Sequence, residues 1–248
     1  MNPTVLSFQN KKNKIKLRGK ILKVYKQMGR AIYDYKMLTE GDHILVAVSG
    51  GADSLSLLKL FLMRQRRVPY QFKITACFVD TNFVQIAKKV VVDYFKDNDL
   101  DYQIKKLELN NKDRNCFWCS WSRRKILFKV ARQLNCNKIA FGHNLDDITE
   151  TILMNMFFFG QISSAPPALD MFSGQIKLIR PLAYLKKEDI LDFAKLISIP
   201  YTKYNCPYGA GNRREKVKKI INDLERNCPQ IKKNIFRSLK KIRKDYLV

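Results

Sequence analysis

The sequence predicts an α/β protein built on a mostly parallel five-stranded sheet with helices on both faces. Short apolar runs rich in β-branched residues alternate with longer helical patterns along the middle of the chain. A glycine-rich turn follows the first of these runs and leads directly into an apolar helix, an order typical of parallel strands joined through helices. Basic amphipathic segments flank this region. We therefore expect a doubly wound domain with basic helical extensions at both ends.

The expected strands and helices follow one another in regular order. Strands are predicted at His43–Ser49, Phe72–Asp80, Tyr102–Leu109, Lys138–Gly142 and Ile176–Pro181. Helices are predicted at Asp53–Gln65, Val84–Asn98, Ser120–Leu134, Asp146–Phe159 and Lys187–Ile197. Two prolines indicate a long loop over Gly160–Gly174.

Three regions are expected along the chain. Residues 1–40 form a basic helical extension, because apolar residues recur at helical spacing from Leu17 to Met37 with basic residues between them. Residues 41–205 form the core domain. Residues 206–248 form a basic tail packed on the core, helical from about Asn212 to Tyr246.

Net charge predicts a polyanionic partner. The chain holds 47 Lys and Arg against 22 Asp and Glu, a net charge of +25. Residues 1–40 carry 10 basic and 2 acidic residues, and residues 203–248 carry 14 and 4. Basic charge at both ends favours nucleic acid as the partner, although a lysine-rich proteome is an alternative cause. Without a run of about 18 apolar residues, no membrane contact is expected. Six cysteines and a polar start predict a reducing, cytoplasmic setting.

The turn after the first strand has the composition of a phosphate-binding loop. Its sequence, Ser49–Ser54, is Ser-Gly-Gly-Ala-Asp-Ser. Gly50 and Gly51 can adopt positive φ and let a ligand approach the backbone, while the helix that follows directs its N-terminal N–H groups at an anion. Asp53 is suited to cap that helix or to reach a metal. The spacing differs from the Walker loop, which requires Gly-Lys-Ser/Thr after four variable residues.

Cysteines form the second constellation. Cys116 and Cys119 make a Cys-x-x-Cys pair at the start of a helix, and Arg123 and Arg124 follow one turn later, where they would favour a thiolate or bind an anion. Cys206 is the natural third thiol. Three cysteines with no obvious fourth are typical of an iron–sulfur cluster with one open iron. A structural zinc site and an unmetallated redox pair remain alternatives.

A second glycine-containing turn lies at the end of the fourth predicted strand. It contains Gly142 and is followed by Asp146 and Asp147 at the start of a helix. These carboxylates could hold Mg²⁺ on a pyrophosphate or position an attacking group, or they could serve only as helix-start charges. Asp80, at the end of the second strand, is placed to contact adenosine.

Together these motifs resemble the tRNA 2-thiocytidine synthetases, a family of PP-loop ATP pyrophosphatases that thiolate tRNA. The resemblance runs from about Lys14 to the C-terminus. Besides the motifs above, it includes Glu40-Gly41-Asp42, Glu150-Thr151, Asn155-Met156-Phe157, Pro166-Pro167, Arg180-Pro181-Leu182-Ala183-Tyr184 and Asp189-Ile190.

This resemblance implies a Rossmann-like PP-loop fold, with residues 41–205 as the ATP pyrophosphatase domain. It implies an ATP-dependent tRNA sulfurtransferase that adenylates a pyrimidine and replaces its C2 oxygen with sulfur, with 2-thiocytidine in the anticodon loop as the favoured product. The implied cofactors are ATP, Mg²⁺ and a [4Fe-4S] cluster. The implied partners are tRNA and a sulfur donor, either a cysteine desulfurase or sulfide. A homodimer is left open.

The family's roles transfer to matching positions of this chain. ATP phosphates would be bound by Ser49, Gly50, Gly51, Asp53 and Ser54, and the nucleotide site completed by Gly142 and Asp146. Adenylation would be assisted by Asp147 and Arg123. The cluster would be held by Cys116, Cys119 and Cys206.

Three departures bear on the target base. Ala52 stands where many thiocytidine enzymes carry lysine, Asn144 replaces a second histidine, and Cys206-Pro207-Tyr208 is similar to the 2-thiouridine branch. The alternatives are therefore a 2-thiouridine-forming thiolase and a PP-loop tRNA ligase of the lysidine synthetase type. An RNA-binding module that has lost catalysis is a third hypothesis.

Overall fold

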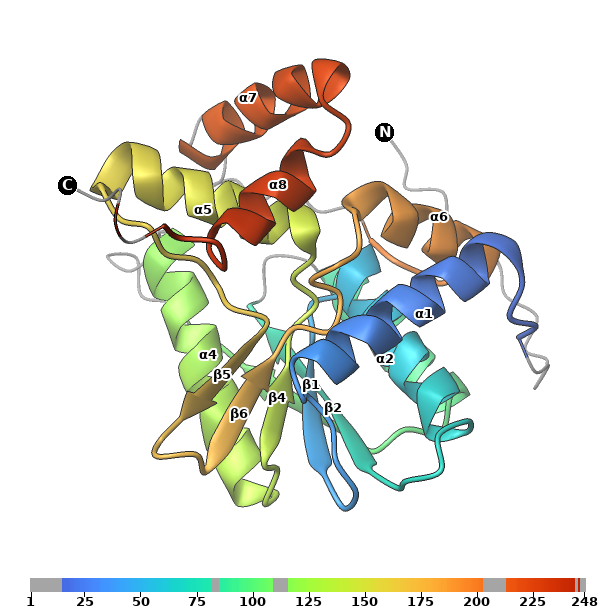
Figure 1. Ribbon diagram of the computed structural model, residues 1–248. Helices are drawn as coiled ribbons and strands as arrows, with labels where there is room; N and C mark the ends of the chain where they lie inside the picture. The colour runs from blue at the N-terminus through green and yellow to red at the C-terminus, as the bar shows by residue number, and fades with distance from the viewer. Residues whose placement is uncertain (1–14, 82–84, 109–115, 203–212, 244, 246–248) are drawn as a thin grey trace.

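A six-stranded sheet forms the centre of the molecule. The computed structural model describes residues 15–81, 85–108, 116–202, 213–243 and 245. The strand order is β3-β2-β1-β4-β6-β5 (Figure 1). The strands are β1 (His43–Val48), β2 (Lys73–Asp80), β3 (Tyr102–Lys106), β4 (Lys138–Ala140), β5 (Ala168–Met171) and β6 (Ile176–Ile179). The α/β class and the mostly parallel sheet are confirmed.

The prediction of five strands was wrong by one strand. Strands β1 to β4 and β6 pair in parallel, whereas β5 pairs antiparallel with β6. β5 lies inside Gly160–Gly174, which the sequence predicted as loop. It is only four residues long, and it is joined to β6 by a turn in which Phe172, Ser173 and Gly174 have positive φ. Such a short, half-exposed edge strand has too little apolar alternation to be detected from the sequence.

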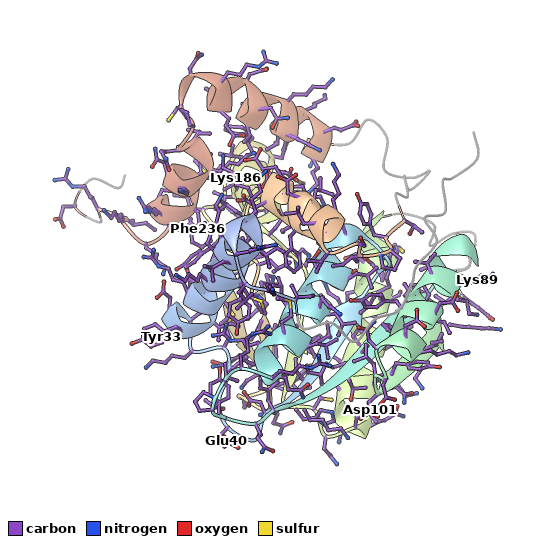
Figure 2. The ribbon with its side chains drawn as sticks, turned by 90° about the vertical axis from the view of Figure 1, so that its right-hand side faces the viewer. Tyr33, Glu40, Lys89, Asp101, Lys186 and Phe236 are labelled. Carbon is purple, nitrogen blue, oxygen red and sulfur yellow. The ribbon has the colours of Figure 1, made fainter. Side chains whose placement is uncertain are left out.

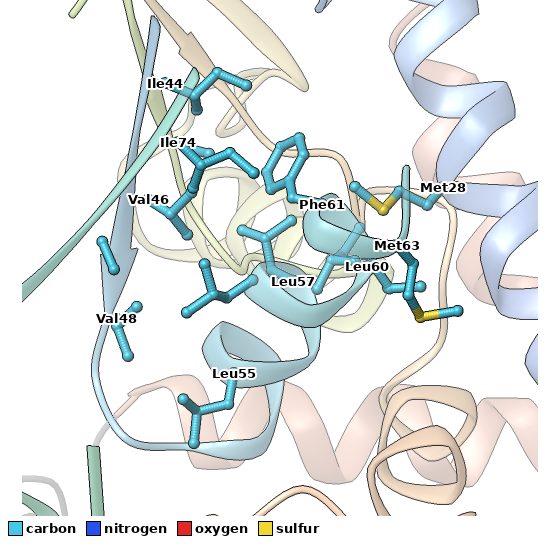
Figure 3. Close-up of a cluster of buried hydrophobic side chains, with 14 of the residues drawn as sticks. Met28, Ile44, Val46, Val48, Leu55, Leu57, Leu60, Phe61, Met63 and Ile74 are labelled. Atoms are coloured by element: carbon cyan, nitrogen blue, oxygen red, sulfur yellow. The ribbon is translucent and has the colours of Figure 1, made fainter. Parts of the chain in front are cut away.

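Helices cover both faces of the sheet. They are α1 (Gly19–Asp34), α2 (Ala52–Gln65), α3 (Gln85–Asp97), α4 (Cys116–Gln133), α5 (Leu145–Phe159), α6 (Lys187–Leu196), α7 (Arg213–Asn227) and α8 (Ile231–Ser238). Strand β1 divides its side chains between two cores. Ile44, Val46 and Val48 belong to the same cluster as residues of α1, α2, α3 and α6, whereas Leu45 belongs to the cluster containing α4 residues. Helix α2 is apolar on most sides because it lies between the sheet and α1 (Figure 3).

The first helix is shorter than the expected Leu17–Met37, and it packs on α6. Its buried residues Val24, Met28, Ala31 and Ile32 face the core. Lys20 and Lys23 form ion pairs of 2.6 and 2.7 Å with Asp192 and Asp189 of α6. No helix in the described ranges is long and apolar enough to cross a membrane.

The described part of the basic tail, residues 213–243 and 245, contains two helices. Helix α7 ends at Asn227 and α8 begins at Ile231, with Pro229 between them. Proline has no N–H and disfavours a helical conformation in the residue before it, so the helix stops there. Both helices pack on α5 through apolar clusters (Figure 1). Phe236 of α8, labelled in Figure 2, contacts Tyr184 with ring centroids 5.8 Å apart.

Candidate nucleotide and thiol site

The loops after β1 and β4 meet at the carboxyl edge of the sheet. The strand order reverses between these two neighbouring strands, the position where ligands bind in open α/β sheets. Contact between the loops is tight. A Cβ atom on Gly142 would lie 3.1 Å from the carbonyl carbon of Asp53 and 3.1 Å from the amide nitrogen of Ser54. Glycine at position 142 therefore lets the second loop lie directly against the first, and a larger residue would require the backbone to shift by a few tenths of an ångström.

The loop Ser49–Ser54 holds its shape through its own polar groups. Gly50 has a φ of +85°, a conformation that glycine adopts without strain. The Ser54 hydroxyl accepts a hydrogen bond from the Ser49 amide at 3.1 Å and donates to the Gly51 carbonyl at 3.0 Å. Gly51 is the N-cap of α2 and has no side chain to cap the helix. The first N–H groups of α2 lack intrahelical partners and point out of this loop, as an anion site requires.

Asp53 lies in the first turn of α2 and connects the two loops with α6. Its carboxylate forms an ion pair with Lys187 and accepts a hydrogen bond from the Asn144 side chain at 3.4 Å. Burial raises the pKa of Asp53, while Lys187 opposes this rise by favouring the charged form. A desolvated carboxylate beside a movable ammonium can exchange that partner for a metal ion or a hydrogen-bond donor.

The two aspartates at the start of α5 have different partners. Asp147 completes a capping box, in which its side chain accepts from the Asn144 amide and its own amide donates to Asn144, each at 3.1 Å. Asp146 uses both of its carboxylate oxygens to contact other helices. One accepts from the Lys187 amide at 2.8 Å, and the other pairs with Lys232 of α8 at 2.7 Å. In this structure Asp146 thus joins α5 to α6 and α8.

Lys232 bridges two carboxylates in the interior. Its ammonium lies 2.7 Å from Asp146 and 2.6 Å from Glu225 of α7, and Lys186 lies 2.7 Å from the other Glu225 oxygen. Burial lowers the pKa of Lys232, but its hydrogen bonds to the two carboxylates outweigh burial and raise the pKa overall. The C-terminal tail therefore supplies a buried cation to the edge where the two loops meet.

A cavity of about 310 Å³ opens beside Lys187, the ion-pair partner of Asp53, and is lined by α5, α6 and α7. Its walls carry acidic and basic side chains in nearly equal number: Asn144, Asp146, Asp147, Glu150, Lys187, Arg214, Glu215 and Lys218. Arg214 pairs with Glu150 at 3.1 Å. Such a mixed lining suits a ligand that is itself charged and polar.

A buried arginine fixes the second loop. Arg180, which follows β6, donates to His143 Nδ1 at 3.3 Å and to the Pro166 carbonyl. Burial and the Arg180 charge together lower the pKa of His143 to about 4, so the imidazole is neutral at physiological pH. Arg124 of α4 also contributes to this lowering. The first turns of α4 thus lie close enough to the second loop for an electrostatic effect.

The cysteine pair lies in the first turn of α4, because the helix begins at Cys116, four residues before the expected start at Ser120. Cys119 is buried, and its sulfur accepts a hydrogen bond from Arg123 at 3.0 Å. The Cys116 side chain and Cys206 lie outside the described part of the structure. Because α4 follows a parallel strand across the sheet, its N-terminus lies at the same carboxyl edge as the two loops.

The sequence pattern of the PP-loop domain matches residues 16–224, which include both loops, α4 and α6. This chain belongs to the PP-loop family. Proteins of similar sequence define its family more narrowly. A tRNA-cytidine(32) 2-sulfurtransferase of Geobacter sulfurreducens is 31% identical over 236 residues, covering 91% of this chain and 92% of that protein. One of Ralstonia pickettii is 35% identical over 246 residues, covering 96% and 76%. The chain therefore belongs to the tRNA 2-thiocytidine synthetase family within the PP-loop proteins.

A solved PP-loop structure has the same fold. The U34-tRNA thiolase NcsA from Methanococcus maripaludis, described with its [4Fe-4S] cluster, superposes with a TM-score of 0.75 at 24% identity. The match covers 90% of this chain and 79% of that chain.

The structure brings most of the described candidate residues to one edge of the PP-loop domain. The Ser49–Ser54 loop contacts Gly142 directly, and Asp146 and Asp147 follow on α5. Asp80 lies at the carboxyl end of the next strand, β2, where it is buried and pairs with Lys88 of α3 at 3.0 Å. Its expected contact with adenosine stays a prediction.

Among the described residues, sequence reasoning missed several charged groups of this edge, including Lys187, Arg214, Glu225 and Lys232. Lys187 follows the Arg180–Tyr184 motif, which was a signal that nearby residues belong to the site. The other three lie in the basic tail among many similar residues. Nothing in their local sequence distinguishes a buried ion-pair partner from a solvated charge.

Proposed function

We propose that this protein is an ATP-dependent tRNA sulfurtransferase that converts a cytidine of the anticodon loop, at position 32, to 2-thiocytidine. The observation that carries the proposal is the contact between an intact phosphate loop and the Gly142 loop, with the Cys119–Arg123 pair at the same sheet edge. Relatives named for this reaction, similar over nearly the whole chain, support the choice of cytidine over uridine or a lysidine-type ligation.

The reaction has two steps, each balanced without a change of oxidation state. The C2 oxygen of the base attacks the α-phosphorus of ATP, the bond to the bridging oxygen of the β-phosphate breaks, and pyrophosphate leaves. Sulfur at the oxidation level of sulfide then bonds to C2, and AMP leaves with the former base oxygen. A desulfurase that delivers persulfide sulfur would need a thiol reductant as well, so sulfide is the simpler donor.

The chain's residues supply binding and orientation for the first step. The N–H groups at the start of α2 bind the phosphates, and the Ser49 and Ser54 hydroxyls hold the loop open. Asp53 would exchange Lys187 for Mg²⁺ on the pyrophosphate, which suits its desolvated carboxylate. Lys187, released from Asp53, would then lie beside the same phosphates and neutralise their charge.

The described thiol fits a cluster ligand. A metal-bound thiolate carries negative charge, and Arg123 places a guanidinium 3.0 Å from the Cys119 sulfur. Cys116, Cys119 and Cys206 would hold a [4Fe-4S] cluster, which would supply an open iron for binding sulfide. Arg123 and Asp147 would orient the base between the two halves of the site. We also propose a cytoplasmic setting, and a homodimer stays a prediction.

One assay tests the proposal directly. Anaerobically purified protein is incubated with ATP, Mg²⁺, sulfide and unmodified tRNA, and the nucleosides are analysed by mass spectrometry. We expect 2-thiocytidine and one AMP per thiolated base. Asp53→Asn should abolish AMP formation, whereas Asp93→Asn, on the exposed surface of α3, should not. Formation of 2-thiouridine or lysidine, or thiolation without AMP, would contradict the proposal.

A further inference from the structure

The C-terminal end of α5 exposes a run of large apolar side chains. Phe157, Phe158 and Phe159 are 54%, 36% and 56% exposed, and Met156 and Ile162 beside them are 44% and 57% exposed. Contiguous exposed apolar surface on a water-soluble domain usually marks an interaction site. Nothing in the nucleotide chemistry above uses this end of the helix.

An arginine covers part of this surface. Arg213, the first residue of α7, lies with its guanidinium 5.0 Å from the Phe158 ring centroid and 5.5 Å from that of Phe159. Helix α7 is held against α5 by Leu153, Val217 and Ile221. Aromatic rings and a guanidinium plane thus form one surface, which we call the α5–α7 platform and define as Phe157, Phe158, Phe159 and Arg213.

The charge around the platform is strongly basic. The first two turns of α7 expose one acidic side chain, Glu215, against five basic ones, of which Arg214 is already paired with Glu150: Arg213, Arg214, Lys216, Lys218 and Lys219. A second copy of the chain docking through the same face would bring two such helices together, which like-charge repulsion opposes. An anionic partner is favoured, and the aromatic rings favour one with flat faces.

We propose that the α5–α7 platform binds unpaired bases of the tRNA anticodon loop by stacking, while the basic side chains of α7 contact the adjoining phosphates. Bases of any sequence stack on aromatic side chains and on arginine planes, and RNA recognition concentrates on unpaired loops for this reason. The inference rests on the proposed function, since it names the part of the substrate that this surface holds.

Helix α5 fixes the platform relative to the reaction site. Asp147 lies at its start in the nucleotide site, and Phe159 is twelve residues further along, a rise of about 18 Å. Both ends belong to a single helix whose N-terminus is held by the capping box. A loop nucleotide bound at the platform would therefore hold its neighbours at a set distance from the phosphate loop.

Binding of an isolated RNA hairpin tests the proposal without requiring catalysis. The probe is the anticodon arm of a substrate tRNA, labelled for fluorescence anisotropy, with the full-length protein. Phe159→Ala should weaken binding about 5- to 150-fold, the range for loss of one aromatic–base stack. Arg213→Ala should weaken it too and reduce the salt dependence, whereas Phe159→Ala should leave the salt dependence unchanged.

The matched control is Phe172→Ala. Phe172 is 55% exposed, nearly the same as Phe159, but lies in the turn between β5 and β6. Hairpin binding should be unchanged by this substitution. Fully base-paired RNA of equal length should be insensitive to Phe159→Ala, since it offers no unpaired base.

Three outcomes would overturn the platform proposal. Hairpin affinity could be the same in Phe159→Ala and wild type. Phe159→Ala could dissociate a dimer in sedimentation while hairpin binding is retained, which would assign the surface to a second copy of the chain. It could instead release the protein from anionic phospholipid vesicles while hairpin binding is retained, which would assign the surface to a membrane. A Phe159-dependent hairpin affinity in a protein that makes no 2-thiocytidine would instead support the platform and contradict the proposed function.

Discussion

Replacing Lys232 by methionine removes the cation that joins α8 to both α5 and α7. Methionine keeps the length and apolar stem of lysine but cannot pair with Asp146 or Glu225. In the wild type these carboxylates lie 2.7 and 2.6 Å from the ammonium, and the Lys232 side chain is only 9% exposed. The substitution therefore leaves two partly buried negative charges facing an apolar group.

The magnitude follows from what each carboxylate retains. Breaking a buried ion pair by removing one partner typically costs about 3–5 kcal/mol. Asp146 keeps its hydrogen bond from the Lys187 amide, and Glu225 keeps Lys186. Both carboxylates are also about one-fifth exposed, which lets water solvate them in part. We therefore expect a loss at the lower end, about 3 kcal/mol, equivalent to a melting temperature about 6–12 °C lower.

Urea denaturation followed by circular dichroism measures this loss. Lys233→Met, on the same helix, is the control and should change the free energy of unfolding by less than about 0.5 kcal/mol. Asp146→Asn added to Lys232→Met should recover part of the loss, because it removes the carboxylate that has lost its cation, while the asparagine oxygen can still accept from the Lys187 amide. A loss below about 1 kcal/mol for Lys232→Met would refute the idea that this cation holds the tail on the core.

The ion pairs of Lys232 also predict that the protein loses stability at alkaline pH. The folded pKa of Lys232 is raised above its ordinary value of 10.5, so the ion pair stabilises the folded state at pH values below 10.5. This contribution disappears as the pH rises through the folded pKa. Wild type and Lys232→Met should therefore converge in stability above that range.

Three further predictions concern the two loops and α6. Gly142→Ala should weaken ATP binding about 10-fold in calorimetry, because its Cβ would lie 3.1 Å from the backbone of Asp53 and Ser54 and one loop must shift by a few tenths of an ångström; unchanged binding would show that the loops accommodate this shift. The low pKa of His143, about 4, predicts that stability falls by about 3 kcal/mol as pH drops from 6.5 to 4, since the unfolded chain takes up the proton first; His143→Gln should flatten this slope in urea titrations. Lys187→Ala should slow AMP formation and destabilise the fold by about 1–3 kcal/mol by leaving Asp53 unpaired, whereas Lys195→Ala in the last turn of α6 should do neither.

The parts of the fold that the sequence predicted well are those with a strong local signal. The run before Ser49 is apolar and β-branched, and the glycines after it require a turn, so β1, the loop and α2 were located to within a residue or two. Strand β5 lacks such a signal because its pairing with β6 is a tertiary contact. The break at Pro229 was readable, but the basic pattern on both sides of it obscured the boundary.

The candidate site likewise contains some residues that the sequence predicted and others that it did not. Short motifs identified Asp53, Gly142 and Cys119 because glycine turns and paired thiols have a recognisable spacing. The partners of these residues were not predictable, since Lys187 is 134 positions from Asp53 and Lys232 is 86 positions from Asp146 in the sequence. Ion pairs over such separations depend on how the helices pack, and any of the 47 basic residues was a candidate.

The position of Lys232 on α8, downstream of every strand of the sheet, has a consequence for biosynthesis. Every strand of the sheet and the whole phosphate loop leave the ribosome before α8 is translated. Until then Asp146 has no lysine from the tail, and α5 presents its acidic first turn without that counter-charge. Translation of α8 is therefore needed before Asp146 can gain this partner, so a polypeptide terminated before Lys232 would carry a recognisable PP-loop yet lack this ion pair.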